Sequence, residues 1–111
     1  MADRFRVGWT EAAVADLERI VTWSAEDSPV NARAVLKRIE HRAGALATSP
    51  RRGHVVPELA ALGHAGHREL TIAPYRLVFR IDRKSIWVEG VFDARRAFDE
   101  ALQDRFLAGM K

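Results

Sequence analysis

The order of apolar patterns along the chain predicts an α+β fold, in which a helical hairpin packs on one face of a twisted sheet. Three observations lead to this fold class. A short alternating segment opens the chain, two capped helical stripes follow it, and three alternating runs separated by turn signals occupy the second half. With 111 residues, 48% of them hydrophobic, the chain can bury one core, so we expect a single domain over residues 1–111.

The first half of the chain predicts one strand and two helices. Apolar side chains alternate over residues 5–9, which is typical of a short strand. Thr10 is a favourable N-cap for a helix over residues 11–27, and Ser28 and Pro29 then provide the cap and first residue of a second helix. This second helix ends before Pro50, and one of its faces carries Ala32, Leu36, Ile39, Ala43 and Leu46. A short turn between the helices makes them a hairpin.

The second half predicts three strands and a closing helix. The strands are expected at about residues 67–72, 75–82 and 85–92. If residues 73 and 74 form a two-residue connection, one sheet face carries core residues, namely Leu70, Ile72, Tyr75, Leu77, Phe79, Ile86 and Val88. Within residues 95–107, the spacing of Phe98, Leu102 and Phe106 predicts a helix. This stripe either packs on its own domain or lies where a partner segment competes for it.

The other face of the predicted sheet is expected to be polar and rich in arginine. It carries His67, Glu69, Thr71, Arg76, Val78 and Arg80, and Arg95 and Arg96 follow the last strand. Glu69 is diagonal to two of these arginines, so the face is either a solvated charge network or a surface for an anionic partner. Trp87 has the parity of this face and is expected to contact a partner, whereas Trp9 and Trp23 are expected to close the core.

Composition excludes several classes of protein. The chain has no cysteine, which excludes a disulfide framework and cysteine zinc sites, and no run approaches the ~20 apolar residues of a membrane span. Since the N-terminus also has no apolar leader, we expect a soluble intracellular protein without membrane contact. The spacing of His54, His64, His67 and Glu58 matches no zinc signature, so neither a metal nor another cofactor is expected. The basic turn at Arg51 and Arg52 is expected to be a solvated helix exit.

Five segments together carry a resemblance to a known family. The runs WTEAAVADLERI, SPVNARAVLKRI, LATSPRRGHVVPEL, RELTIAPYRLVFRID and VFDARR resemble the RelE/ParE superfamily of bacterial toxins, in order and over nearly the whole chain, and lie closest to the ParE branch. The resemblance implies a twisted antiparallel sheet with an N-terminal helical hairpin on one face. It also implies the cytoplasmic toxin of a bacterial type II toxin–antitoxin module, held in a hetero-oligomer by a cognate antitoxin that is acidic, folds on binding and binds DNA.

The resemblance implies two possible modes of action. RelE-type toxins cleave mRNA on the ribosome without a metal, whereas ParE-type toxins inhibit DNA gyrase by binding it. Arg76 and Arg95 match arginines of the RelE catalytic set, and either Glu58 or His67 could act as its acid or base. The RelE lysine pair, however, falls on His67 and Glu69, and its late tyrosine falls at about Ala101.

We therefore expect a ParE-like gyrase inhibitor rather than an enzyme. The alternatives are a ribosome-dependent mRNA interferase and an attenuated toxin that only binds its antitoxin. The residues expected to contact the target or the antitoxin are Arg68, Arg76, Arg80, Trp87, Arg95 and Arg96. In this hypothesis the antitoxin covers the outer sheet face and the flank of the helical hairpin, and places acidic residues against Arg76 and Arg80.

Overall fold

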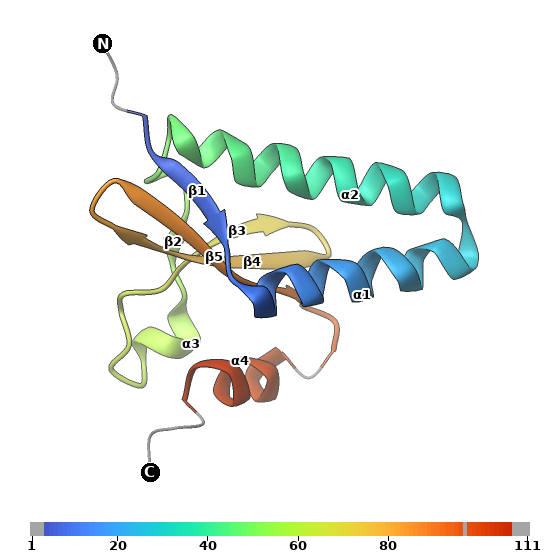
Figure 1. Ribbon diagram of the computed structural model, residues 1–111. Helices are drawn as coiled ribbons and strands as arrows, with labels where there is room; N and C mark the ends of the chain where they lie inside the picture. The colour runs from blue at the N-terminus through green and yellow to red at the C-terminus, as the bar shows by residue number, and fades with distance from the viewer. Residues whose placement is uncertain (1–3, 97, 108–111) are drawn as a thin grey trace.

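The computed structural model describes residues 4–96 and 98–107 and has the α+β architecture that the sequence predicts (Figure 1). Its elements follow the chain as β1 (Arg6–Trp9), α1 (Glu11–Asp27), α2 (Pro29–Gly44), the 3-10 helix η1 (Ala45–Ala47), β2 (His54–Val55), α3 (Pro57–Ala60), β3 (Arg68–Ile72), β4 (Tyr75–Asp82), β5 (Ser85–Asp93) and α4 (Phe98–Phe106). No helix in this part of the chain is long and apolar enough to cross a membrane.

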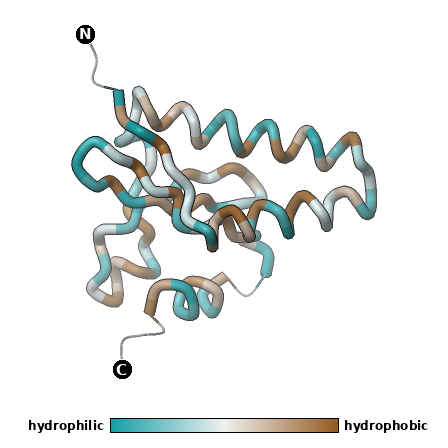
Figure 2. Tube along the Cα trace, viewed as in Figure 1, coloured by the Kyte–Doolittle hydropathy of each residue, from teal (hydrophilic) through white to brown (hydrophobic). Residues whose placement is uncertain are grey.

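Both long helices begin at the predicted caps. The Thr10 hydroxyl accepts a hydrogen bond from the Ala13 N–H at 3.2 Å, and the Ser28 hydroxyl accepts one from the Asn31 N–H at 3.2 Å. Hydrophobic and hydrophilic residues alternate along α1 and α2, as in helices with one buried face (Figure 2). The two helices therefore pack on the sheet as an antiparallel hairpin, as predicted.

The strands form one mixed sheet in the order β1-β5-β4-β3-β2. The pairs among β2, β3, β4 and β5 are antiparallel, but β1 runs parallel to β5, with Val7 opposite Ile86. The parallel pair is possible because the helical hairpin and three further strands provide the long crossover that it requires. Strand β2 lies in a segment that the sequence places in a loop, and it adds a short edge to β3.

The hairpin of β3 and β4 has the predicted register, with Ile72 opposite Tyr75 and Leu70 opposite Leu77. The pairing of β4 with β5 contains a bulge that alternation along one strand does not reveal. Val78 lies opposite Gly90 and Phe79 opposite Val88, so Glu89 lacks a residue opposite it. Because of this shift, Val91, which shares the parity of Trp87, turns into the core rather than to the outer face.

The sheet has a core on each face. The inner core lies under α1 and α2 and contains the predicted apolar face, including Leu70, Leu77 and Phe79. The second core lies on the outer face, which the sequence analysis left open to solvent or a partner. It consists of Val56, Leu59, Val78, Phe92, Phe98 and Leu102. Helices α3 and α4 therefore cover the outer face, and the predicted stripe of the closing helix packs on its own sheet.

Candidate functional site

Arg76 lies between two carboxylates on the covered face of the sheet. Its Nη1 and Nη2 donate to the two oxygens of Glu58 at 2.9 and 2.8 Å, and its Nε donates to Glu69 Oε1 at 2.6 Å. The Arg76 Nη2 also donates to Glu69 Oε2. The Phe98 ring closes the site, with its centroid 3.7 Å from the guanidinium carbon. Elements α3, β3, β4 and α4 thus meet at this one guanidinium.

The two carboxylates determine the electrostatics of this site. Burial opposes the charge of Arg76, but hydrogen bonds and charges from Glu58 and Glu69 outweigh burial and raise the pKa of the guanidinium above its ordinary value. The hydrogen bond from Arg76 in turn lowers the pKa of Glu58, against the opposing effect of burial. Glu58 is therefore an anion at neutral pH and a weak proton acceptor.

Arg80 belongs to a second network, centred on Glu89. His67 Nδ1 lies 3.0 Å from Glu89 Oε1, and Arg80 Nε lies 3.3 Å from Glu89 Oε2. The predicted pair of Glu69 with Arg80 is absent from the described residues, because the bulge places Glu89 beside Arg80 while Arg76 engages Glu69. Phe106 of α4 covers the His67 ring, with the ring centroids 4.6 Å apart.

Arg95 and Arg96 share a third carboxylate, Asp93, at the end of β5. The Arg95 guanidinium donates to both Asp93 oxygens at 2.9 and 2.8 Å, and these hydrogen bonds lower the pKa of Asp93. Arg96 lies 3.9 Å from Asp93, and its guanidinium carbon stands 3.4 Å from the centroid of the Trp23 ring. Trp23 is 50% exposed, so its predicted place in the core is wrong; its ring is the platform for Arg96.

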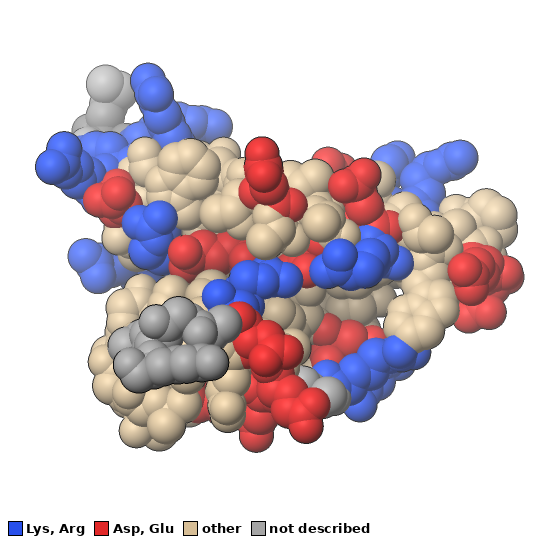
Figure 3. Space-filling model, turned by 60° about the horizontal axis from the view of Figure 1, so that its bottom comes forward, with Lys and Arg blue, Asp and Glu red and all other residues tan. Residues whose placement is uncertain are grey.

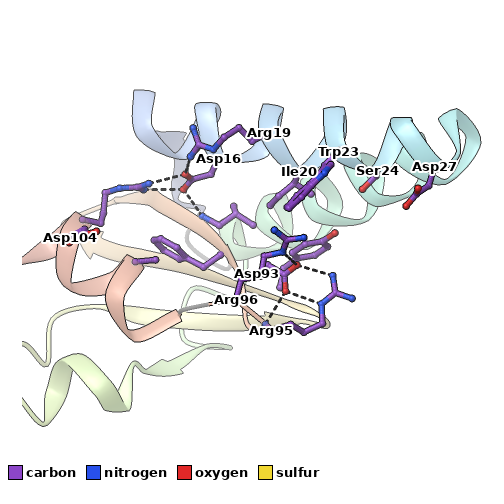
Figure 4. A pocket seen from close by; sticks show the side chains of 15 residues that line it. Asp16, Arg19, Ile20, Trp23, Ser24, Asp27, Asp93, Arg95, Arg96 and Asp104 are labelled. Carbon is purple, nitrogen blue, oxygen red and sulfur yellow. Dashed lines mark hydrogen bonds and ion pairs between the residues drawn. The ribbon is translucent and has the colours of Figure 1, made fainter.

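A groove of about 750 Å³ lies beside this third cluster, between α1, the end of β5 and α4 (Figure 4). Ile20, Trp23 and Tyr75 provide apolar lining, and the Arg95 and Arg96 side chains are mostly exposed at its edge. The groove therefore combines an aromatic surface with cations that solvent can reach.

Asp16 is a buried charge that the sequence analysis missed. It is 4% exposed and accepts hydrogen bonds from the Val91 N–H at 3.0 Å and from the Arg105 guanidinium at 2.8 and 3.0 Å. Arg19 lies 2.5 Å from it. A sequence signal for this site does exist, since Asp16 stands three residues after Ala13 and four before Ile20, on the apolar stripe of α1. This carboxylate connects α1, β5 and α4.

The remaining predicted residues lie apart from these clusters. Arg68 donates to the Gly53 carbonyl, and its Nε is buried without a partner among the described residues. Trp87 is 37% exposed and lies over Gly8, where an added Cβ would come within 2.7 Å of the ring. Across residues 4–96 and 98–107, no group of three or more His, Asp or Glu residues could hold a metal ion.

The predicted residues thus form several clusters rather than one site. Arg76 lies with Glu58, His67 with Arg80, and Arg95 with Arg96. Each cluster includes at least one carboxylate, and the Arg76 cluster has two for its single positive charge. Of the arginines in the predicted site, Arg76, Arg80, Arg95 and Arg96 are thus already engaged by acidic side chains, whereas Arg68 donates to a backbone carbonyl.

Comparison with known proteins gives two kinds of similarity. The profile of a family described as the ParE toxin of the type II toxin–antitoxin system, parDE, matches residues 7–98. The fold resembles the chromosomal ParDE toxin–antitoxin system from P. aeruginosa, with a TM-score of 0.67 and 23% identity over 83% of this chain and 98% of that one.

A second solved structure has a similar fold. It is a RelBE toxin–antitoxin complex from Mycobacterium tuberculosis, with a TM-score of 0.57 and 24% identity over 84% of this chain and 93% of that chain. At these identities, both likenesses show the fold alone. No curated protein is significantly similar in sequence.

Proposed function

The chain belongs to the ParE toxin family of type II toxin–antitoxin systems, and we propose that it inhibits bacterial growth by binding DNA gyrase until a cognate antitoxin neutralises it. It would act in the cytoplasm, where this target works on DNA. In this proposal the chain is a binding inhibitor and not an enzyme. The position of Arg76 between two carboxylates is the observation that carries this choice.

Metal-free cleavage of RNA requires a base, an acid and cations that stabilise the charge developing on the phosphate. Arg76 is the matching phosphate ligand, but hydrogen bonds to Glu58 and Glu69 already use four of its five N–H donors. Glu58, as a candidate base, has a lowered pKa, which weakens it at neutral pH. His67 is engaged by Glu89 under Phe106. This arrangement supports inhibition by binding over catalysis.

One observation favours the mRNA interferase as a second candidate. Glu58 contacts Arg76 directly, so an acid–base candidate lies beside the arginine that matches the phosphate ligand. A substrate phosphate that displaced Glu58 from Arg76 would leave this carboxylate next to the reacting group. The interferase would then need a substrate-induced exchange of partners at Arg76.

For the antitoxin, we propose the groove between α1 and the end of β5 as the contact surface. The outer sheet face is unsuitable because α3 and α4 cover it. Trp23 offers an exposed aromatic surface, and Arg95 and Arg96 offer accessible cations for acidic residues of an antitoxin segment that folds on binding. Arg80 and Trp87 lie outside this groove and would contribute to a different contact.

Induced expression in bacteria without an antitoxin distinguishes the targets. We expect filamentous cells and a DNA-damage response while translation continues, because a gyrase inhibitor acts on DNA topology first. Rapid arrest of translation with mRNA cut at the ribosomal A site would instead establish the interferase. Absence of any growth effect from a folded, expressed chain would contradict both and leave a protein that only binds its antitoxin.

Charge reversal tests the proposed antitoxin surface. We expect Arg95→Glu with Arg96→Glu to weaken the binding of a co-purified antitoxin, measured by titration calorimetry, because acidic antitoxin residues would then face acids. The matched control is Arg33→Glu with Lys37→Glu, which makes the same charge change on the exposed side of α2. Equal affinities for both double variants would reject this surface.

A further inference from the structure

Basic residues gather at one end of the sheet, away from the clusters described above. In Figure 3, Lys and Arg side chains crowd the left end of the molecule. Three chain segments meet at this end, namely residues 4–6, residues 48–53 and the β4–β5 turn over residues 82–85. We call the exposed basic residues of these segments the basic end: Arg4, Arg6, Arg51, Arg52, Arg83 and Lys84.

Backbone contacts hold the three segments together. The Arg6 N–H donates to the Lys84 carbonyl at 2.9 Å, and the Phe5 N–H donates to the Ala47 carbonyl at 2.8 Å. The loop that carries Arg51 and Arg52 closes on the sheet at Gly53, where an added Cβ would meet the Glu69 carbonyl at 2.5 Å. The basic end is therefore a surface that the fold assembles from distant parts of the sequence.

Most other arginines of the described residues have an ion-pair or hydrogen-bond partner for their side chain, which the arginines of the basic end lack. Arg76, Arg95 and Arg105 each form an ion pair with a carboxylate. Among the residues that the structure describes, no carboxylate pairs with the arginines of the basic end, at positions 4, 6, 51, 52 and 83. The acid of these three segments, Asp82, lies 3.5 Å from Arg80. Arg38, Arg42 and Arg68 also lack a carboxylate, but each donates to a backbone carbonyl. Of the described arginines without any side-chain hydrogen bond or ion pair, all but Arg33 therefore lie at the basic end.

We propose that the basic end binds the phosphate backbone of nucleic acid without reading its sequence, as a surface separate from the one that contacts the antitoxin. Exposed arginines suit this ligand because guanidinium groups make bidentate contacts with phosphate oxygens. A protein partner is less well matched, since the centre of a protein interface is apolar, whereas the six residues that define the basic end are all charged. The groove proposed for the antitoxin does not include these arginines in its lining. The proposal does not depend on which target the toxin inhibits.

Salt dependence gives this proposal a quantitative form. Each phosphate that a cation neutralises contributes about −0.9 to the slope of log affinity against log salt on duplex DNA. Four contacts from the basic end would therefore give a slope of about −3.6. Because the contacts are to the backbone, duplexes of unrelated sequence should bind equally well.

The experiment measures fluorescence anisotropy of a short labelled DNA duplex with the purified full chain, at salt concentrations from about 50 to 200 mM. The test variant is Arg52→Gln with Arg83→Asn, because asparagine tolerates the positive φ of 58° at position 83. Its matched control is Arg33→Gln with Lys37→Gln, which removes the same charge from α2. Far-UV circular dichroism verifies that both variants are folded.

We expect the affinity of the test variant for DNA to fall at least tenfold near 100 mM salt. The slope of its log affinity against log salt should be shallower by about 1.8, and the control variant should match the wild type in both quantities. Equal losses in both variants would mean that net charge alone governs binding and would overturn the proposal, as would failure of the wild type to bind at low salt. An RNA duplex could also bind more tightly than DNA and lose the same affinity in the test variant. That result would support a site for the phosphate backbone and identify RNA as its ligand. If labelled polyglutamate bound as tightly as the duplex, the result would overturn the nucleic-acid proposal and indicate an acidic protein as the partner of the basic end.

Discussion

At the scale of single residues, Arg76 shows how its surroundings decide what a charged side chain does. Its guanidinium contacts Glu69, which is 2% exposed, and Glu58, while Phe98 covers it. Replacement of a buried ion pair by apolar residues can be neutral, but removal of one partner leaves a buried charge uncompensated. The side chain of Arg76 therefore holds α3 and α4 against the sheet.

Substitution of Arg76 tests this structural role. We expect Arg76→Met to lower the free energy of unfolding by about 3 kcal/mol, because Glu69 would remain buried without its cation. Urea unfolding monitored by circular dichroism measures the change. Arg80→Met is the control, since that side chain is 40% exposed and its removal should cost much less. Equal costs for both variants would contradict the buried role of Arg76.

The lowered pKa of Glu58 predicts a pH dependence of stability. A carboxylate whose folded-state pKa lies below its ordinary value of 4.5 stabilises the fold above that pH, and the stabilisation is lost as pH falls through the folded-state pKa. We expect Glu58→Gln to be less stable than the wild type at neutral pH and equally stable in strong acid, measured by urea midpoints across this range. When Arg76 is also replaced by Met, the difference in stability between Glu and Gln at position 58 should no longer depend on pH. If the pH dependence persisted unchanged without Arg76, this arginine would be excluded as its cause.

At the scale of elements, α4 is attached to the sheet by apolar burial and by one ion pair. Leu102 is fully buried and Phe98 nearly so, and both pack on the outer face. Arg105 reaches across to Asp16 of α1 and also donates to the Glu89 carbonyl at 2.9 Å. The helix thus connects the edge of the helical hairpin with the bulge of β5.

Removal of Arg105 should loosen α4 more than it loosens the rest of the molecule. We expect Arg105→Ala to accelerate amide hydrogen exchange in α4 and in the first turns of α1, because Asp16 would lose its bidentate partner while buried. Hydrogen exchange read by mass spectrometry measures this effect by segment. Asp104→Ala, at an exposed position of the same helix, should leave exchange unchanged. Uniform acceleration of exchange across all strands would show that the ion pair stabilises the whole fold rather than the attachment of α4.

At the scale of the whole molecule, the two cores share one sheet. Strand β4 contributes Leu77 and Phe79 to the inner core and Val78 to the outer one. Loss of either core would therefore expose apolar residues of the same strand. Positive charge is also unevenly distributed, because carboxylates compensate it over the cores, whereas the arginines of the basic end have no carboxylate partner among the described residues.

A shared sheet predicts one cooperative unfolding transition for the chain. Tryptophan fluorescence reports Trp9, Trp23 and Trp87, whereas far-UV circular dichroism reports the helices and the sheet. We expect both probes to give the same urea midpoint and slope, because neither core can persist without β4. An earlier fluorescence or dichroism transition, separate from the main one, would show that α4 and the outer core unfold as an independent unit.

The sequence by itself determined the three longer helices, the strands β1, β3, β4 and β5 and the inner core, because local signals suffice for these, but not β2 or α3. The caps at Thr10 and Ser28 mark where the helices begin, and alternation along β3 and β4 assigns Leu70 and Leu77 to the face under the helices. Five motifs in order also indicated the toxin family, and the family profile over residues 7–98 agrees with them.

Only the tertiary structure decided what the charged residues do, because their partners come from distant segments. Glu58 reaches Arg76 from a loop helix, and Arg105 reaches Asp16 across 89 positions of the chain. The bulge beside Glu89 moved Val91 into the core and gave Arg80 a different carboxylate. Alternation and spacing describe one segment at a time, whereas ion pairs and a second core depend on which segments the fold brings together.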